Sequence, residues 1–488
     1  MSDFYSSTDH FTIIPAVMLA LFGCAVLLFD FLIFPDPKQR KWLAFFVVLA
    51  EGFVGYGLYN QHEFLIKSGQ ALEGFGGSVR VDDFGIFFNC IFLVAALIVT
   101  LVSAKYLEVA GEHHGEYYSL ILFAQCGMYF LATGTDLVTL FIGLELMALC
   151  FYVMVGFLRT DKRSNEAALK YLLLGAFSTG FLAYGFSVLY GIAGSTKLTV
   201  IAIEIQKRPL WDPVVFLAMA TTTIGLLFKL SAAPFHMWAP DAYEGAPTTV
   251  TAYLSVASKA ASMAFLLRLF LGPFDSIRAE WEPLLIAVAL LTLTIGNLSA
   301  MNQTNIKRLL AYSSISHAGY MLLGLIAGND TGIKGISVYV LVYTFMNLGA
   351  FLVVIAMRRQ NIIGDDLEDF NGLMHRHPGY AVLMLIFLLS LAGIPPTAGF
   401  LGKYYIFFAL IQTRHYGLAV VATLYVAVAI YYYFKIVRSM FIREESAPAP
   451  LSTSLGMRVA LGAAGVLTLA IGLYPEPFLR MAETSLLR

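Results

Sequence analysis

Long apolar segments, separated by short polar breaks, run through almost the whole chain. About twenty apolar residues are enough to cross a bilayer as one helix. The pattern therefore predicts an all-α integral membrane protein with about fourteen transmembrane helices. The expected limits of these helices are 11–34, 42–60, 84–107, 117–134, 137–158, 168–192, 213–238, 248–271, 283–300, 308–328, 335–357, 379–412, 416–441 and 457–475.

Two of these segments, the seventh and the twelfth, contain residues that interrupt a helix. Pro234 lies in the seventh segment, and Pro395 and Pro396 lie in the twelfth. Proline removes a backbone donor and clashes with the preceding turn, and a broken helix is tolerated at membrane depth only beside protein or a polar cavity. The two interruptions are five helices apart. This spacing indicates two five-helix repeats, spans 4–8 and 9–13, with the second repeat inverted in the membrane.

The repeats divide the chain into four expected parts. These are an N-terminal three-helix segment (1–110), a first repeat (117–271), a second repeat (283–442), and a connector with the last transmembrane helix (443–488). The residues 444–450 (EESAPAP) are expected to form a short surface connection within the last part.

Lys and Arg gather in the loops that follow odd-numbered spans. Such an excess is typical of cytoplasmic loops, and an even number of spans places both termini on one side. We therefore expect both termini on the outer, periplasmic side. The basic residues behind this prediction are Lys38, Arg40, Lys41, Arg159, Lys162, Arg163, Arg358, Arg359, Arg376, Arg438 and Arg443.

The composition excludes several classes of protein. Hydrophobic residues make up 59% of the 488 residues and charged residues only 13%, which excludes a soluble globular protein and a disordered one. The 31 basic and 32 acidic residues leave a net charge of −1, so no basic patch is expected to bind nucleic acid. The acidic first ten residues lack Lys and Arg, which is wrong for a signal peptide and indicates a retained first span.

The cysteines do not predict a metal or iron–sulfur site. Cys24, Cys90, Cys126 and Cys150 lie singly inside apolar segments, and no two have CxxC spacing. They are expected to pack as small apolar residues.

Ionisable residues in the middle of apolar spans are costly, so each one needs a compensating partner or a function. Glu145 lies in mid-span with no other charge within a helical turn. It is either a structural hydrogen-bonding group or a titratable carboxylate that needs a basic partner. Lys170 follows Glu166 by four residues, a favourable helix pair. Lys170 either extends to the interface or is the partner of Glu145.

Two further lysines lie beside the predicted helix breaks. Lys229 comes just before Pro234, and Lys403 follows Pro395 and Pro396. Transporters place ion sites at such breaks near the middle of the membrane. Lys259 lies at the centre of the eighth span among small residues that favour close helix packing. The alternative for each lysine is an ammonium group that reaches the membrane surface.

One histidine and one further glutamate complete the set. His317 lies in mid-span among serines; it is either a satisfied core residue or a proton relay, since imidazole titrates near neutrality. Glu51 in the second span remains open between a structural and a functional role.

Together, these residues form a row of Glu, Lys, Lys, His and Lys that suits proton movement better than binding of a polar solute. A change in the distance between Glu145 and a lysine would switch that lysine between its charged and neutral forms. The sequence contains no phosphate-binding loop and no catalytic constellation that would supply energy, so the drive must come from an ion gradient or from partner subunits. A subunit of a cation/proton antiporter and a structural scaffold remain the alternatives to a proton-translocating subunit of a redox-driven complex.

Three long stretches resemble a known family. They are SNEAALKYLLLGAFSTGFLAYGFSVLYG, FKLSAAPFHMWAPDAYEGAPTTVTAYLSVASKAA and LAGIPPTAGFLGKYYIF. These stretches resemble subunit N of the proton-pumping NADH–quinone oxidoreductase, respiratory complex I, in the family of antiporter-like subunits. The resemblance spans roughly residues 120–410. Subunit 2 of the photosynthetic-type quinone oxidoreductase is also similar.

The resemblance implies a membrane subunit with two inverted five-helix repeats, broken seventh and twelfth helices, and a central polar axis coupled to distant quinone reduction. It implies a translocase subunit without a redox centre, in the bacterial cytoplasmic (inner) membrane. NADH, FMN, iron–sulfur clusters and quinone are then expected on partner subunits. The partners are a neighbouring antiporter-like subunit and small membrane subunits.

The resemblance also implies a role for each charged residue of the row. Glu145 would be the essential carboxylate and Lys170 the lysine beside it. Lys229 would be the lysine of the broken helix, Lys259 the connecting lysine and Lys403 the residue on the exit side. His317 matches the histidine of the tenth span. A lysine at the last position fits subunits N and L better than M, and 488 residues leave no room for the long lateral helix of L.

Overall fold

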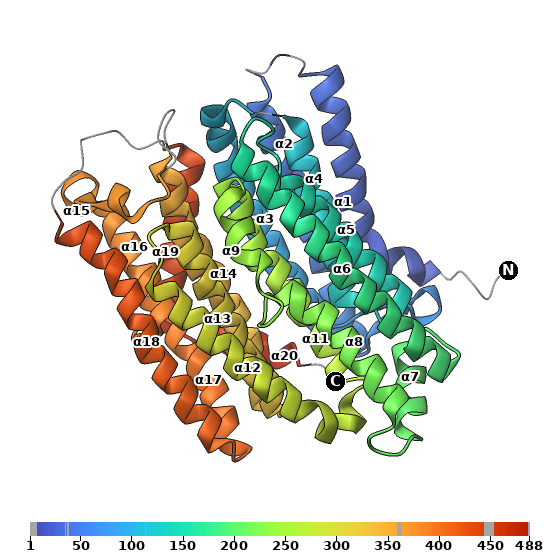
Figure 1. Cartoon of the computed structure of the whole chain (residues 1–488). Coiled ribbons are helices and arrows are strands. Elements are labelled where there is room, and N and C mark those ends of the chain that lie inside the picture. The colour runs from blue at the N-terminus through green and yellow to red at the C-terminus, as the bar shows by residue number, and fades with distance from the viewer. Residues whose placement is uncertain are drawn as a thin grey trace.

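The computed structural model describes residues 7–34, 36, 39–112, 114–358, 364–443 and 453–486. Lys38, Arg359 and the expected surface connection 444–450 lie outside the described residues. Within them the fold is almost entirely α-helical, as predicted (Figure 1). Twelve of the described helices are long and apolar enough to cross a membrane.

The first part of the chain consists of three long helices and a small hairpin. The helices are α1 (Ser7–Leu32), α2 (Lys41–Ser68) and α3 (Asp83–Ala110). Between α2 and α3, the strands β1 (Leu72–Gly74) and β2 (Val79–Val81) pair antiparallel around the 3₁₀ turn Phe75–Gly77. The sequence did not predict this hairpin, because three-residue strands are too short to produce a recognisable alternation.

The middle of the chain contains long helices and one helix broken into two parts. Its elements are α4 (Gly115–Thr133), α5 (Leu137–Val155), α6 (Lys162–Ala193), the short α7 (Leu198–Gln206), α8 (Pro213–Leu230), α9 (Trp238–Gly245), α10 (Thr248–Tyr253), the π-helical turn Leu254–Ser258 and α11 (Lys259–Phe270). The last three form one continuous helical stretch from Thr248 to Phe270.

The rest of the chain contains a second broken helix and ends with a short helix. Its elements are the 3₁₀ turn Asp275–Ile277, α12 (Arg278–Met301), α13 (Ile306–Ala327), α14 (Asp330–Met357), the 3₁₀ turn Leu367–Phe370, α15 (Leu373–Arg376), α16 (Pro378–Ala392), α17 (Ala398–Gln412), α18 (Tyr416–Phe441), α19 (Leu455–Leu473) and α20 (Glu476–Thr484).

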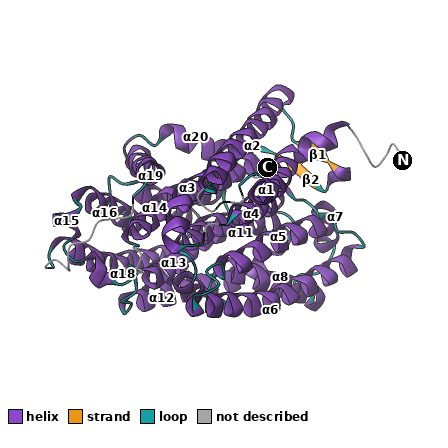
Figure 2. Ribbon diagram, turned by 90° about the horizontal axis from the view of Figure 1, so that it is seen from above, coloured by secondary structure: helices purple, strands orange, loops and turns teal. Residues whose placement is uncertain are grey.

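The helices form one elongated bundle. Seen from above, α5, α6 and α8 lie toward one end, and α15, α16 and α18 lie toward the other (Figure 2). The most buried helices lie between these ends. The stretch from Thr248 to Phe270 is fully buried inside the bundle, and α13 and α14 are nearly so. Lys259 and His317 belong to these central helices.

Aspartates in the loops fix where several helices begin. Asp82, Asp136, Asp161 and Asp212 stand directly before α3, α5, α6 and α8, and each side chain accepts hydrogen bonds from backbone N–H groups of the first turn. Such caps satisfy donors that have no partner within the helix. The hydrogen bond from the Val214 N–H holds the pKa of Asp212 below its usual value.

The cap at Asp161 corrects one predicted boundary. Apolar character suggested that the sixth span begins near residue 168, but α6 begins at Lys162, because the Asp161 carboxylate accepts a 2.9 Å hydrogen bond from the Arg163 N–H. The first six residues of α6 are mostly polar, so an apolar pattern cannot detect them.

Both predicted helix breaks are present, and both begin before the prolines. α8 ends at Ser231 (φ 55°) and α16 ends at Gly393 (φ 83°), two residues in the left-handed conformation. In each case the next residue donates a backbone hydrogen bond to the helix: Ala232 N–H to Leu227 O (2.9 Å), and Ile394 N–H to Leu389 O (3.0 Å). This is the Schellman type of helix ending, and the prolines then prevent continuation.

The second break depends on a close approach between two helices. At Gly399, in the first turn of α17, an added Cβ would lie 1.8 Å from the Ser390 carbonyl oxygen of α16. The Gly399 N–H also donates to Ser390 Oγ (3.0 Å). A residue without a side chain is therefore required where the two half-helices meet.

We expect Gly399→Ala to destabilise the protein by about 3 kcal/mol, because the contact is with backbone that cannot move aside. The measurement is the thermal unfolding midpoint of the purified protein in detergent. Gly379→Ala on α16 is the control, because an added Cβ there meets no atom within 4 Å. Equal midpoints for the two variants would contradict this account of the break.

Candidate functional site

Lys229 lies at the end of α8, one turn before the first break, and is 2% exposed. Its Nζ donates a 2.9 Å hydrogen bond to the hydroxyl of Tyr152 on α5. Glu145 lies two turns earlier on α5, within electrostatic range of Lys229. The Glu145 carboxylate accepts a 2.7 Å hydrogen bond from the Thr179 hydroxyl of α6. Glu145 and Lys229 thus belong to one cluster, which includes two hydroxyl groups.

The predicted ion pair between Glu145 and Lys170 is absent. The Lys170 side chain is 46% exposed and pairs with Glu166 (2.8 Å) and Asp241 (3.1 Å). These carboxylates lie on the same outer face of α6 and on α9, so they hold the ammonium group away from Glu145. Among the described residues, Lys229 is the basic side chain within electrostatic range of Glu145, although no ion pair joins the two.

Lys170 belongs instead to a polar cavity of about 290 Å³ between α6, α9 and α13. Arg308 of α13 completes this group. It forms ion pairs with Asp241 (2.8 Å) and with Glu244 (2.9 Å).

Aromatic packing fixes the position of Tyr152. Its ring meets Tyr171 at 4.6 Å, and Tyr171 stacks on Trp238 at 4.3 Å. Trp238 Nε1 donates to the Phe228 carbonyl (2.8 Å), in the last turn of α8, which also accepts the Ser231 N–H. An added Cβ at Gly175 of α6 would lie 2.0 Å from the Tyr152 hydroxyl. The contact between Tyr152 and Lys229 therefore depends on the absence of a side chain at position 175.

Lys259 forms the centre of the second cluster. It is 1% exposed and begins α11, directly after the π-helical turn; such turns are frequent at functional sites. Its Nζ donates a 2.8 Å hydrogen bond to the Ser314 carbonyl of α13. The Ser314 hydroxyl accepts a 2.8 Å hydrogen bond from Tyr343 and lies 3.5 Å from the Tyr243 hydroxyl.

His317 lies one turn after Ser314 on α13 and is 1% exposed. Its Nδ1 is 2.6 Å from the Tyr339 hydroxyl, and its Nε2 is 3.1 Å from the Tyr433 hydroxyl. Both ring nitrogens are therefore engaged. Lys259 and Lys403 both lie within electrostatic range of this ring, so His317 is placed between the two lysines.

Lys403 of α17 binds the end of α16. Its Nζ donates to the carbonyl oxygens of Leu391 (3.0 Å) and Ala392 (2.9 Å), which the break leaves without helical partners. The Nζ also lies 4.9 Å from the centre of the Tyr320 ring, a cation–π distance. This lysine is 4% exposed.

Glu145 and Lys229 therefore lie in one cluster, Lys259, His317 and Lys403 lie in a second, and Lys170 lies outside both. The hydroxyl groups that contact these residues directly were not predicted: Tyr152, Thr179, Tyr339 and Tyr433. The same holds for Tyr243 and Tyr343, whose hydroxyls contact the Ser314 hydroxyl. Tyrosine counts as apolar in a hydropathy pattern, although a buried tyrosine hydroxyl usually needs a partner. The tyrosines inside the predicted spans were the sequence feature that could have indicated these hydroxyl contacts.

Another buried lysine has a structural role. Lys307 of α13 is 3% exposed and donates 2.7 Å hydrogen bonds to the carbonyls of Glu244 and Ala246, at the end of α9. Its Nζ lies 3.5 Å from Asp365 Oδ2. Burial raises the pKa of the Asp365 carboxyl above its usual value, and the charge of Lys307 opposes this rise.

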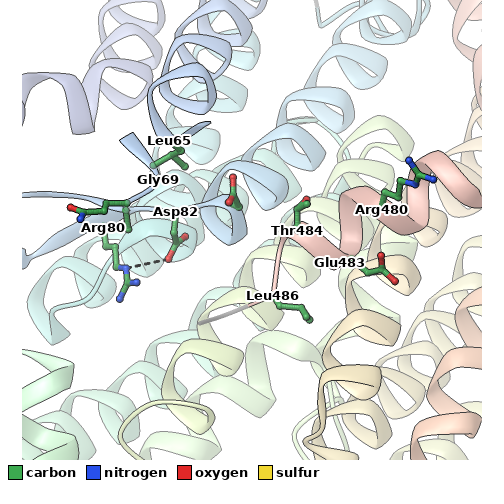
Figure 3. Close-up of a pocket in the computed structure, with 11 residues that line it drawn as sticks. Leu65, Gly69, Arg80, Asp82, Arg480, Glu483, Thr484 and Leu486 are labelled. Carbon is green, nitrogen blue, oxygen red and sulfur yellow. Dashed lines mark ion pairs between the residues drawn. The ribbon is translucent and has the colours of Figure 1, made fainter. Parts of the chain in front are cut away.

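A cavity of about 600 Å³ lies away from the charged row (Figure 3). It is lined by the end of α2, by Arg80 and Asp82 near β2, and by Arg480 and Glu483 on α20. None of the six predicted residues lines it. Among the described residues, no group of three or more His, Cys, Asp or Glu side chains is arranged to hold a metal ion.

Comparisons with known proteins agree on one family. The family model described as NADH:quinone oxidoreductase/Mrp antiporter, TM, matches residues 134–429. The chain is 79% identical over 487 residues to NADH-quinone oxidoreductase subunit N 2 of Solibacter usitatus (strain Ellin6076), with 99% of each chain covered.

Solved structures share the fold. A chain of respiratory complex I from Thermus thermophilus with bound aureothin is 33% identical, with a TM-score of 0.79, covering 96% of this chain and 99% of that one. A chain of the Mrp complex from Dietzia sp. DQ12-45-1b is 21% identical, with a TM-score of 0.82, covering 98% of this chain and 97% of that one. The second likeness shows the fold alone.

We expect Gly175→Ala to separate Tyr152 from Lys229, because the new methyl group would occupy the position of the hydroxyl. An electron cryomicroscopy map of the variant should show the phenol out of hydrogen-bond range of Nζ. Gly180→Ala, on the same helix and with no atom within 4 Å of an added Cβ, should leave this contact intact. An unchanged distance between the Tyr152 hydroxyl and Lys229 Nζ in Gly175→Ala would refute this role for Gly175.

Proposed function

Because this chain belongs to the NADH:quinone oxidoreductase/Mrp antiporter family of membrane subunits, we propose that it is a proton-translocating subunit of an NADH–quinone oxidoreductase. It is a multi-pass membrane protein, and its partners are the other membrane subunits of that complex. The bacterial relatives favour the cytoplasmic (inner) membrane as its location.

One observation carries the proposal. Lys229, Lys259 and Lys403 are each 4% exposed or less, and each ammonium group is bound by oxygen acceptors rather than by a carboxylate ion pair. A scaffold has no need for three such groups. A neutral amine in the same place can accept a proton, and an ammonium group can release one, without loss of packing.

The proposed proton path joins the two clusters. It runs from Glu145 to Lys229 in the first cluster, and then through Lys259, His317 and Lys403 in the second, with tyrosine hydroxyls beside Lys229 and His317. Lys170, which is exposed and paired with Glu166 and Asp241, lies at the polar cavity beside this path rather than in it.

Glu145 controls the charge of Lys229. At an effective dielectric constant of about 20, a carboxylate about 6 Å from an ammonium group stabilises the charge by about 3 kcal/mol. That energy corresponds to about a hundredfold change in proton affinity. A modest displacement of Glu145, or its neutralisation, is therefore enough to make Lys229 release its proton.

The drive for this displacement comes from other subunits. NADH, FMN, iron–sulfur clusters and quinone belong to the partner subunits in this proposal, and the present chain contributes proton transfer without a redox centre. The likeness to a chain of the Mrp complex makes a subunit of a cation/proton antiporter the alternative, but at 21% identity it extends only to the fold.

The finer topology belongs to the same proposal. Fourteen spans result when α4 and the broken pair α16–α17 are added to the twelve apolar helices. Two inverted repeats would comprise the helices from α4 to α11 and from α12 to α18. The left-handed endings at Ser231 and Gly393, each followed by proline, support their equivalence. The four parts of the chain then follow the limits predicted from the sequence.

The basic loops support an orientation with both termini in the periplasm. α7 and α20 lie at the lower end of the bundle in Figure 1, and α15 lies at the opposite end. In this orientation the lower end faces the periplasm, and Arg376 and Arg438 belong to the cytoplasmic end.

We expect Lys229→Ala to lower NADH-driven proton pumping by about a hundredfold, the lower end of what a positioned proton-transfer group contributes. The measurement is proton uptake by membrane vesicles, with assembly checked by purification of the complex with its flavin and iron–sulfur subunits. Lys105→Ala is the control, because Lys105 is 36% exposed and pairs with Glu108 at the end of α3. Normal pumping by an assembled Lys229→Ala complex would exclude the proposed path.

We expect Glu145→Gln to impair pumping more than Glu51→Gln. The Glu145 charge acts on Lys229, whereas Glu51 lies outside the row. Both substitutions keep the size of the side chain, so proton uptake by vesicles compares the loss of an ionisable group at two positions. Equal losses of proton pumping in the two variants would contradict the assignment of Glu145 as the carboxylate that acts on Lys229.

A further inference from the structure

Glu51 is a buried mid-span acid that the proposed path does not use. It lies in the middle of α2 and is 0% exposed. Among the described residues, its side chain forms one hydrogen bond, 3.1 Å long, which Gln125 Nε2 of α4 donates to its Oε2. Within the described part of the chain, no basic side chain forms an ion pair with Glu51. An ionised carboxylate in this position would be a buried charge without a counter-charge, which is strongly unfavourable.

Two oxygen atoms at this contact have no partner. Among the described residues, Glu51 Oε1 and Gln125 Oε1 are both buried and accept no hydrogen bond. Buried polar atoms of this kind require an explanation. An ionised carboxylate can only accept hydrogen bonds, so it cannot satisfy the amide oxygen.

One proton on Glu51 Oε1 supplies the missing donor. A protonated carboxyl group donates through its O–H and still accepts at the other oxygen. It can then donate to Gln125 Oε1 while Gln125 Nε2 donates to Glu51 Oε2. The acid and the amide thereby satisfy each other by two hydrogen bonds, and no charge is buried.

A tyrosine of the central helices is a neighbour of this pair. Tyr253 of α10 lies within electrostatic range of Glu51, and its hydroxyl donates to the Ile121 carbonyl (3.4 Å) of α4. Its ring packs against Phe151 at 5.3 Å. Tyr253 directly precedes the π-helical turn that leads to Lys259. Cys126 follows Gln125 in the chain and is also titratable. Its thiol donates to the Ala16 carbonyl (3.5 Å) and therefore does not bind the pair.

We propose that Glu51 is a proton-binding site beside the row, protonated at rest and hydrogen-bonded to Gln125. Release breaks the Oε1–H bond, leaves a carboxylate on Glu51, and gives the proton to a neutral amine of the row. Rebinding reverses both changes, and no electron is exchanged. The resting state follows from the local contacts alone, whereas release during turnover rests on the proposed function.

Infrared difference spectroscopy of the whole complex in lipid membranes tests both parts. At neutral pH, the C=O stretch of a protonated carboxyl group should be lost in Glu51→Gln. It should persist in Glu63→Gln, because Glu63 is an exposed glutamate on the same helix that pairs with Lys67 at 2.8 Å. Addition of NADH should change this band in the wild type.

Two results would overturn the proposal. The first is a resting spectrum in which Glu51→Gln removes only a carboxylate band. The second is a protonated band that does not respond to NADH in a complex that pumps protons normally. The second result leaves the proposed function intact, because pumping is measured in the same membranes. Conversely, normal pumping by Lys229→Ala would exclude the proposed path, but it would not change the resting band of Glu51.

Discussion

A positive charge inside a membrane protein is stable only where oxygen atoms surround it, and much of this structure supplies those oxygens. Regular helices use almost all of their carbonyl groups internally. The interruption of α16 frees the carbonyls of Leu391 and Ala392, and Lys403 binds both. The turn before α11 places Lys259 against the Ser314 carbonyl. Departures from regular helix therefore help to stabilise the buried ammonium groups of Lys403 and Lys259 in this fold.

Tyrosine hydroxyls supply further hydrogen-bonding oxygens to the buried basic side chains. Tyr152 accepts from Lys229, while Tyr339 and Tyr433 contact the two nitrogens of His317. A hydroxyl can both donate and accept, so the same group can serve a charged or a neutral neighbour. This property distinguishes the clusters from fixed ion pairs such as Arg268 with Asp82, where each partner has one stable charge.

The sequence predicted the helical fold and both interruptions, and five of the six charged residues that it singled out lie in the two clusters described above. These features have strong local signals, because a lysine or a proline within an apolar segment is conspicuous. The partner of Glu145 could not be predicted in this way. Lys170 is nearer along the chain, but its direction around α6 and the position of Asp241 depend on tertiary packing. The tyrosine contacts were missed for the same reason, since hydropathy does not reveal where a phenol points.

Helix α13 contacts both the end of α9 and the cluster around Lys259 and His317, through different residues. Lys307 holds the end of α9, Ser314 binds Lys259, and His317 lies between two tyrosines. Arg308 joins the same helix to Asp241. Contacts to Lys259, to the tyrosines around His317 and to the end of α9 therefore all converge on one helix. A displacement of α13 would change the surroundings of both buried bases in a single movement.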